Sequence, residues 1–291
     1  MAAAPGMQTQ VYPRSDEQAL QAWAQLGPAS CLDCVHESLM KIALLSDIHS
    51  NLQALQACLD HAQAQGAQQF ALLGDLIGYG ADPGPVLDKV MALVEAGAAC
   101  VRGNHDEAAL APKPAPRTLA EQSAQWTAPQ LDARQRAFLQ GLPLTARLGA
   151  SALLVHASAD SPGRWHYVLD ANAAERSLDA ATLMDPAIRY VFSGHVHEQA
   201  LYFLTPTAKL MRFAPQPGVA VPVPPHRQWL ALVGSCGQPR DGDTRAMYAL
   251  FDEQDATLCF HRVSYDHMGA AAAVRSTGLP ALCADRLEQG L

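Results

Sequence analysis

Strand and helix patterns alternate in the part of the chain that follows Met40. Short apolar runs typical of buried strands occur at residues 41–46, 69–73 and 99–101. Between them, residues 51–66 and 83–97 carry apolar side chains at helical spacing, and each stretch ends at a glycine. This alternation predicts βαβ units, and therefore an α/β fold built on a buried, mostly parallel sheet.

The pattern changes twice in the rest of the chain. Residues 111–145 begin as a proline-rich loop and continue as two short helix patterns, which we interpret as a helical insertion near the site. Strand patterns resume at residues 151–155 and 189–193, with a helix pattern at 172–184 between them. After residue 199, closely spaced strand patterns divided by Pro/Gly loops predict an antiparallel second sheet.

The two ends of the chain carry weaker patterns. Residues 1–39 contain Pro and Gly breaks and no strand pattern, so we expect a loose N-terminal extension. The main domain is expected over residues 40–265, and residues 266–291 are expected to form a C-terminal tail. A chain of 291 residues is long enough to bury a substantial core.

Composition and charge narrow the classes of function. The formal net charge of −8 argues against a general affinity for nucleic acid or for an anionic membrane. No stretch reaches the roughly 18 consecutive apolar residues of a membrane span, and the first residues lack the pattern of a secretory signal. Seven scattered cysteines do not indicate a disulfide framework, so a cytoplasmic location is expected.

A polar cluster follows each of the five strand patterns between residues 41 and 193. The candidate side chains of these clusters are Asp47 and His49, then Asp75, then Asn104, His105 and Asp106, then His156, and finally His195 and His197. Taken alone, the Gly-Asn-His-Asp stretch is also typical of a turn. Because the carboxyl ends of strands in open α/β sheets form the ligand crevice, we expect the clusters to converge on one site.

The residue types in these clusters indicate metal binding. Asp47 and His49, like His195 and His197, stand two residues apart, which places both side chains on one side of an extended segment. The candidates outnumber the ligands that a single ion takes, whereas two ions sharing a carboxylate could use them all. Nitrogen and oxygen donors without thiolate favour Mn, Fe, Co or Zn over Ca or Mg.

In this order, the clusters resemble the signature of the calcineurin-like metallophosphoesterase superfamily. The motifs are "DIH" at 47–49, "GDLIGYG" at 74–80, "GNHD" at 103–106, "VHA" at 155–157 and "GHVH" at 194–197. The later stretch "GSCGQPRDGDTRAMYALFD" resembles the closing segment of a compact bacterial phosphodiesterase branch. The resemblance implies a four-layer α/β/β/α sandwich of the metallo-dependent phosphatase type, with the active site at the carboxyl ends of the strands.

The resemblance also implies roles for individual residues. One metal would be bound by Asp47, His49 and His197, the other by Asn104, His156 and His195, with Asp75 bridging the two. His105, held by Asp106, would be the catalytic acid beside the leaving oxygen, and Asn104 would also contact the substrate. The two divalent or mixed-valence ions would be Mn, Fe, Co or Zn, with Mn or Fe favoured.

The reaction implied is hydrolysis of a small-molecule or nucleotide phosphodiester or phosphomonoester by attack of a metal-bridging hydroxide. Protein phosphatases and diadenosine tetraphosphatases of the superfamily carry Asp-Arg before the last glycine of the second motif, and "GDLIGYG" lacks that arginine. Arg240 either supplies a substrate-binding positive group from another loop or lies on the surface. A nucleotide or dinucleoside polyphosphate pyrophosphohydrolase, a protein phosphatase and a non-catalytic scaffold stay as alternatives.

Overall fold

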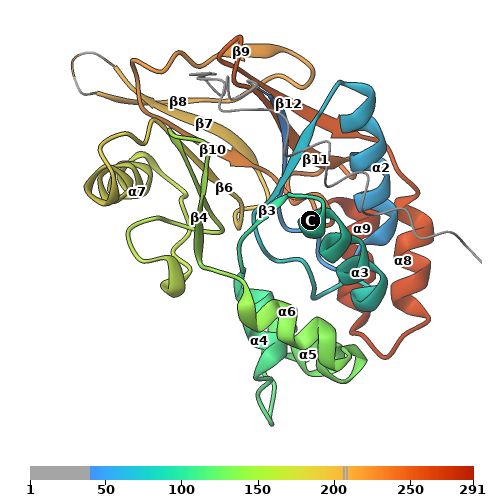
Figure 1. The fold of residues 1–291 in the computed structure, drawn as a ribbon. Coiled ribbons are helices and arrows are strands. Elements are labelled where there is room, and N and C mark those ends of the chain that lie inside the picture. The colour runs from blue at the N-terminus through green and yellow to red at the C-terminus, as the bar shows by residue number, and fades with distance from the viewer. Residues whose placement is uncertain (1–39, 206, 208) are drawn as a thin grey trace, which may run out of the picture. The chain divides into compact units, whose positions relative to one another are not determined.

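The computed structural model describes residues 40–205, 207 and 209–291 (Figure 1). The stretch 1–39, for which the sequence predicts a loose extension, lies outside the described residues. Within the described part, two six-stranded sheets lie between helices, as Figure 1 shows.

The first sheet has the strand order β3–β2–β1–β11–β12–β9. Its strands are β1 (Lys41–Leu45), β2 (Gln69–Leu72), β3 (Ala99–Cys100), β9 (Ala220–Pro222), β11 (Ala246–Asp252) and β12 (Thr257–Val263). Strands β1, β2 and β3 are parallel, as the βαβ pattern predicts. Strand β11 pairs antiparallel with β1, with Phe251 opposite Ile42.

The second sheet has the order β4–β5–β6–β10–β7–β8. Its strands are β4 (Thr145–Leu148), β5 (Ala152–Val155), β6 (Tyr190–Ser193), β7 (Gln199–Leu204), β8 (Leu210–Phe213) and β10 (Trp229–Val233). Strands β5, β6 and β10 are parallel, and only β4, β7 and β8 run antiparallel to their neighbours.

The expectation that the last strands form their own antiparallel sheet is therefore wrong. Strand β10 lies parallel to β6, while β11 and β12 join the first sheet. Every residue of β11 is buried, so this strand needs a neighbour on each edge and cover on both faces. In the first sheet, β1 and β12 pair with the two edges of β11, and side chains pack on both of its faces. The short strands β4 and β9 have no strand pattern in the sequence.

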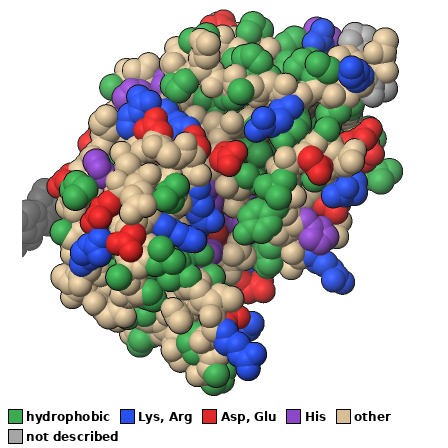
Figure 2. Space-filling model, turned by 180° about the vertical axis from the view of Figure 1, so that it is seen from behind, with side chains coloured by type: hydrophobic (Ala, Val, Ile, Leu, Met, Phe, Trp, Pro, Cys, Tyr) green, Lys and Arg blue, Asp and Glu red, His purple; other side chains and the backbone are tan. Residues whose placement is uncertain are grey.

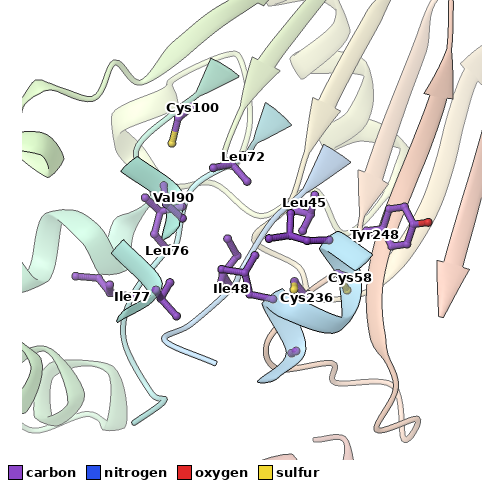
Figure 3. Close-up of a cluster of buried hydrophobic side chains, with 14 of the residues drawn as sticks. Leu45, Ile48, Cys58, Leu72, Leu76, Ile77, Val90, Cys100, Cys236 and Tyr248 are labelled. Atoms are coloured by element: carbon purple, nitrogen blue, oxygen red, sulfur yellow. The ribbon is translucent and has the colours of Figure 1, made fainter. Parts of the chain in front are cut away.

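Helices cover the outer face of each sheet. On the first sheet lie α2 (Leu52–Ala64), α3 (Pro83–Glu95), α8 (His267–Arg275) and α9 (Ala281–Gln289), and on the second lies α7 (Ala171–Met184). Alternate residues of β1 face opposite sides: Leu45 packs towards the helices, and Leu44 packs between the two sheets. Figure 3 shows Leu45 and Leu72 in the cluster on the helical side. The α/β/β/α sandwich predicted from the sequence is confirmed.

Two helical segments complete the described fold. Helix α4 (Asn104–Leu110) precedes the insertion, which contains α5 (Leu119–Thr127) and α6 (Ala133–Gly141). Two short 3₁₀ helices occur at Ala128–Gln130 and Pro162–Arg164. The segment expected as a C-terminal tail forms α8 and α9, because small apolar side chains recur along it at helical spacing and pack around Tyr79. None of the helices described is long and apolar enough to cross a membrane.

Candidate metal centre

Loops from both sheets bring the polar clusters together. Asp47 and His49 follow β1, Asp75 follows β2, and Asn104 opens α4 after β3. His156 follows β5 in the second sheet, and His195 and His197 follow β6. All of these side chains are buried except that of Asn104, which is half-buried. The convergence expected from the strand ends is what the structure shows.

The backbone of these loops is held in an unusual conformation. Five of the candidate ligands have left-handed φ angles, namely Asp47 (53°), His49 (50°), Asp75 (49°), His195 (66°) and His197 (65°). This conformation costs a non-glycine residue about 1–2 kcal/mol. Hydrogen bonds across the site hold it, including one of 2.8 Å from the backbone N–H of His195 to Asp47 Oδ2. The strain is concentrated where the side chains converge.

Asp47, His49 and His197 form one half of the centre. The Nδ1 atoms of His49 and His197 lie 3.3 Å and 2.6 Å from the carbonyl oxygens of Ile77 and Gln238. Since a carbonyl only accepts, each Nδ1 carries the proton and each Nε2 presents a lone pair. These two Nε2 atoms face each other at 3.1 Å, and Asp47 Oδ1 is 3.1 Å from that of His197. Facing lone pairs repel, and a cation between them would remove that repulsion.

His156 and His195 repeat the arrangement in the other half. His156 Nδ1 is 2.8 Å from the carbonyl oxygen of Leu73, and His195 Nε2 is 3.0 Å from that of Trp165. The remaining nitrogens of the two rings face each other at 3.2 Å. Asn104 Oδ1 lies 3.1 Å from His156 Nε2, so an amide oxygen joins the same group. The donor set fits a second cation.

Asp75 lies between the two halves. Its Oδ2 is 3.2 Å from His156 Nε2 and 3.8 Å from His49 Nε2. The possible ligand atoms fall into three groups, and within each group they lie no more than 4.8 Å apart. The groups are Asp47, His49 and His197; His49, Asp75 and His105; and Asp75, His156 and His195. His49 and Asp75 each belong to two of these groups, but only Asp75 shares a group with residues of both halves, as a bridging ligand would.

The electrostatics of the centre indicate a need for positive charge. Burial tends to raise the pKa of Asp47 and Asp75, yet neighbouring histidines hold both well below the usual range. Burial alone would lower the pKa of His156, but the adjacent Asp75 raises it to about 9. Burial lowers the pKa of His195 to about 4. Without a cation, a proton on His156 therefore balances part of the carboxylate charge.

The His105 side chain points into the same region, and its ring makes no hydrogen bond to a described residue. Its Nδ1 is buried and has no partner among the described side chains or backbone. The ring lies 4.9 Å from that of His49 and 4.4 Å from that of Tyr79, measured between centroids. Its backbone N–H donates to Asp75 Oδ1 at 2.7 Å. Burial lowers the pKa of His105, although Asp75 opposes this effect.

The expectation that Asp106 holds the His105 side chain is wrong. Asp106 Oδ1 accepts from the backbone N–H groups of Leu76 (2.9 Å) and Ile77 (3.3 Å), and its Oδ2 accepts from Gly103 at 2.8 Å. The residue stands in the first turn of α4, where a carboxylate caps free N–H groups. Burial, reinforced by Asp75, raises the pKa of Asp106 to about 7. Asp106 therefore joins the loops after β2 and β3.

Arg240 reaches the mouth of the centre from the loop after β10. Its Nη2 donates to Gln238 Oε1 at 2.8 Å, and its guanidinium carbon lies 5.6 Å from the centroid of the Tyr79 ring. Sequence reasoning missed two aromatic residues here. Tyr79 takes the place before the last glycine of the second motif. Tyr167 stacks on His195 at 3.9 Å, and no motif marks it.

Comparison with known proteins agrees with this geometry. Residues 40–199 match the family model described as calcineurin-like phosphoesterase. The uncharacterized protein MJ0912 of Methanocaldococcus jannaschii is 29% identical over 257 residues, covering 86% of this chain and 98% of that protein.

Two solved structures have similar folds. A metallophosphoesterase from Sphaerobacter thermophilus is 32% identical with a TM-score of 0.73, covering 87% of this chain and 99% of that one. The hypothetical protein PH1004 from Pyrococcus horikoshii is 17% identical with a TM-score of 0.67, covering 86% and 98%. At that identity, the second shows similarity of fold alone.

Proposed function

The chain belongs to the calcineurin-like phosphoesterase family, and we propose that it is a metal-dependent hydrolase of small-molecule or nucleotide phosphodiesters or phosphomonoesters. The observation that carries this proposal is the pair of facing imidazole nitrogens on each side of Asp75. Each pair is arranged for a cation, and a carboxylate between two cations is typical of centres that hydrolyse phosphoesters.

The proposed ligands are those predicted from the motifs. Asp47, His49 and His197 would hold one ion, Asn104, His156 and His195 the other, and Asp75 would contact both. When bound, two divalent ions supply Lewis-acid stabilisation of phosphoryl oxygens and lower the pKa of water. The nitrogen and oxygen donors suit Mn, Fe, Co or Zn, and we favour Mn or Fe.

The remaining roles fall to side chains at the mouth of the centre. His105 has a buried nitrogen without a partner, which supports its role as proton donor to the departing oxygen. The guanidinium of Arg240 would donate to non-bridging oxygens of the phosphate, and Asn104 would contact the substrate as well as the metal. Asp106 would act on His105 only through the position of α4.

The expected partner is a small-molecule phosphoester, and the expected location of the protein is the reducing cytoplasm. The formal charge of −8 gives no support for binding to nucleic acid. The five described cysteines are free, which supports a cytoplasmic location.

A substrate screen with a matched pair of variants tests the proposal. Mn²⁺-loaded protein should hydrolyse p-nitrophenyl phosphate, its bis ester or a member of a nucleotide panel, and chelation should abolish turnover. Asp75→Asn should lose turnover by more than the roughly 10- to 100-fold typical of losing an outer partner of a metal ligand. Asp179→Asn, on the exposed face of α7, removes the same charge as a control. Bound metal without hydrolysis of any ester would favour the scaffold alternative, and hydrolysis of anhydrides alone would favour the pyrophosphohydrolase.

A further inference from the structure

Two arginines from the last part of the chain lie against Tyr79. The guanidinium carbon of Arg240 is 5.6 Å from the ring centroid, and that of Arg286, in α9, is 5.8 Å away. Both arginines are half-buried, whereas the Tyr79 side chain is almost fully buried. The two cations thus meet at the position of the second motif that lacks its own arginine.

Neither of these guanidinium groups is paired with a carboxylate in the described part of the chain. Nearby arginines are paired: Arg245 with Asp243, Arg262 with Asp241 and Arg275 with Asp285. Arg240 instead donates to the neutral amide oxygen of Gln238. The Arg286 side chain has no hydrogen bond to any described residue. A half-buried guanidinium without an anion has lost water and gained no charge partner, which is typical of a group that binds an anionic ligand.

Packing on Tyr79 explains one arginine but not two. A single guanidinium against an aromatic ring is attracted by it. A second guanidinium near the same ring adds a like charge to the same region, and an anion bound by both groups would offset that unfavourable interaction. The arrangement is therefore most stable when an anion is bound.

This pair of cations adjoins the metal centre. The Tyr79 ring contacts His105 and His49, with centroid distances of 4.4 Å and 4.9 Å. Figure 2 shows histidine side chains in a hollow of one face, with Lys or Arg side chains beside them. The two arginines therefore lie one aromatic side chain away from the proposed metal ligands.

We propose that Arg286, together with Arg240, binds a second anionic group of the substrate. The preferred substrate is then a phosphoester that carries a further phosphate or phosphonate-like anion a few bonds from the scissile phosphorus. Arg240 is shared between the two anionic groups, and Arg286 contacts only the second. This inference rests on the proposed phosphoesterase function and defines its substrate class more closely.

Equilibrium binding of two non-hydrolysable probes tests the inference on the full-length protein. Titration calorimetry of Mn²⁺-loaded protein would compare ethylphosphonate with ethane-1,2-bisphosphonate, which adds one anionic group. The wild-type protein should bind the bisphosphonate more tightly. Arg286→Met should reduce that preference about tenfold, as expected for the loss of a charged hydrogen-bonded contact. Arg286→Lys should keep part of it, and Arg176→Met on exposed α7 controls for loss of one positive charge.

Other results of the titrations would overturn this inference or the proposed function. Equal losses for both probes in Arg286→Met and Arg286→Lys would make Arg286 a packing residue and overturn the inference. An undiminished bisphosphonate preference in Arg286→Met would show that other groups hold the second anion. If esters are hydrolysed and ethylphosphonate binds, but the wild type shows no preference, only this inference fails. If neither probe binds and no ester is hydrolysed, the proposed function fails with it.

Discussion

At the scale of single residues, His195 shows how several constraints meet in one proposed metal ligand. Its backbone N–H donates to Asp47, its Nε2 donates to the carbonyl oxygen of Trp165, and the Tyr167 ring stacks on its imidazole. Its φ of 66° is allowed by these contacts rather than by its own preference. The preceding residue, Gly194, has no room for a side chain, since a Cβ there would overlap Ser46 Oγ and Asp47 Oδ2. A ligand loop of this kind tolerates little change.

Gly194→Ala should therefore lose metal binding. The added methyl group would displace Asp47, so we expect less bound metal and lower turnover, while the helices stay folded. Elemental analysis and circular dichroism measure the two effects. Gly141→Ala is the matched control, because a Cβ at that position meets open space. Full metal occupancy in Gly194→Ala would contradict the assignment of Asp47 as a ligand.

His105→Ala should separate catalysis from metal binding. General acid help is worth roughly 10² to 10⁴ in rate and matters most when the departing oxygen is basic. Turnover of an alkyl ester should therefore fall more steeply than turnover of a p-nitrophenyl ester, with both metals retained. The backbone N–H that donates to Asp75 is unchanged in this variant. Loss of one metal would instead make His105 a ligand, in agreement with its place beside His49 and Asp75.

At the scale of elements, the sequence predicts single helices and strands better than their partners. The apolar spacing of residues 172–184 predicts α7 closely, because the helix period is a local property. The pairing of β11 with β1 depends on competition among all the strands, which no local pattern contains. The same holds for the site: motifs predicted the residues that converge on the centre, but not the approach of α9 to Tyr79.

A second histidine cluster links α2, β11 and β12 away from the metal centre. His261 stacks on Tyr248 with centroids 4.7 Å apart and lies 5.1 Å from His61. Its Nε2 is buried without a partner among the described atoms. Burial, with a smaller contribution from His61, lowers the pKa of His261 to about 4. The ring is therefore neutral in the folded protein and protonated more readily after unfolding.

This difference predicts a pH dependence of stability. Between pH 6.5 and pH 4 the unfolded chain binds a proton at His261 that the folded chain does not. The contribution of the neutral His261 ring to stability is complete above pH 6.5. As the pH drops towards 4, the free energy of unfolding falls by up to about 3 kcal/mol. Urea unfolding should show a shallower loss of stability over this range in His261→Gln. His226→Gln, at an exposed position, should keep the wild-type slope. Identical slopes in all three proteins would rule out this contribution.

At the scale of the whole molecule, hydrogen bonds between Met40 and Glu253 tie the first described residue to the rest of the fold. The backbone N–H of Glu253 donates to the carbonyl oxygen of Met40 at 3.2 Å, and Glu253 Oε2 accepts from the N–H of Met40 at 3.3 Å. We expect a chain that starts at Met40 to fold and to keep its metal-dependent turnover. Circular dichroism and the ester assay measure this. A truncated chain that does not fold, or that loses most turnover, would make residues 1–39 part of the domain.

The candidate metal centre also joins the two sheets. Asp47 and Asp75 come from loops of the first sheet, while His156 and His195 come from loops of the second. An ion bound by both sets can be held only when the sheets are in place, so it stabilises the folded state and not the unfolded one. Without ions, the facing nitrogens and the buried carboxylates should oppose the packing of the sheets.

Removal of metal should therefore lower the unfolding temperature. An ion present at 100 times its dissociation constant adds about 2.7 kcal/mol, which for a domain of this size corresponds to a rise of about 5–10 °C. Scanning calorimetry with excess Mn²⁺ and with chelator measures the difference. In Asp75→Asn the two unfolding temperatures should converge, because the residue placed between both halves has lost its charge, whereas Asp179→Asn should keep the wild-type difference. An unfolding temperature that chelator leaves unchanged in the wild type would show that the strained loops hold their shape unaided, and that these side chains do not bind metal tightly.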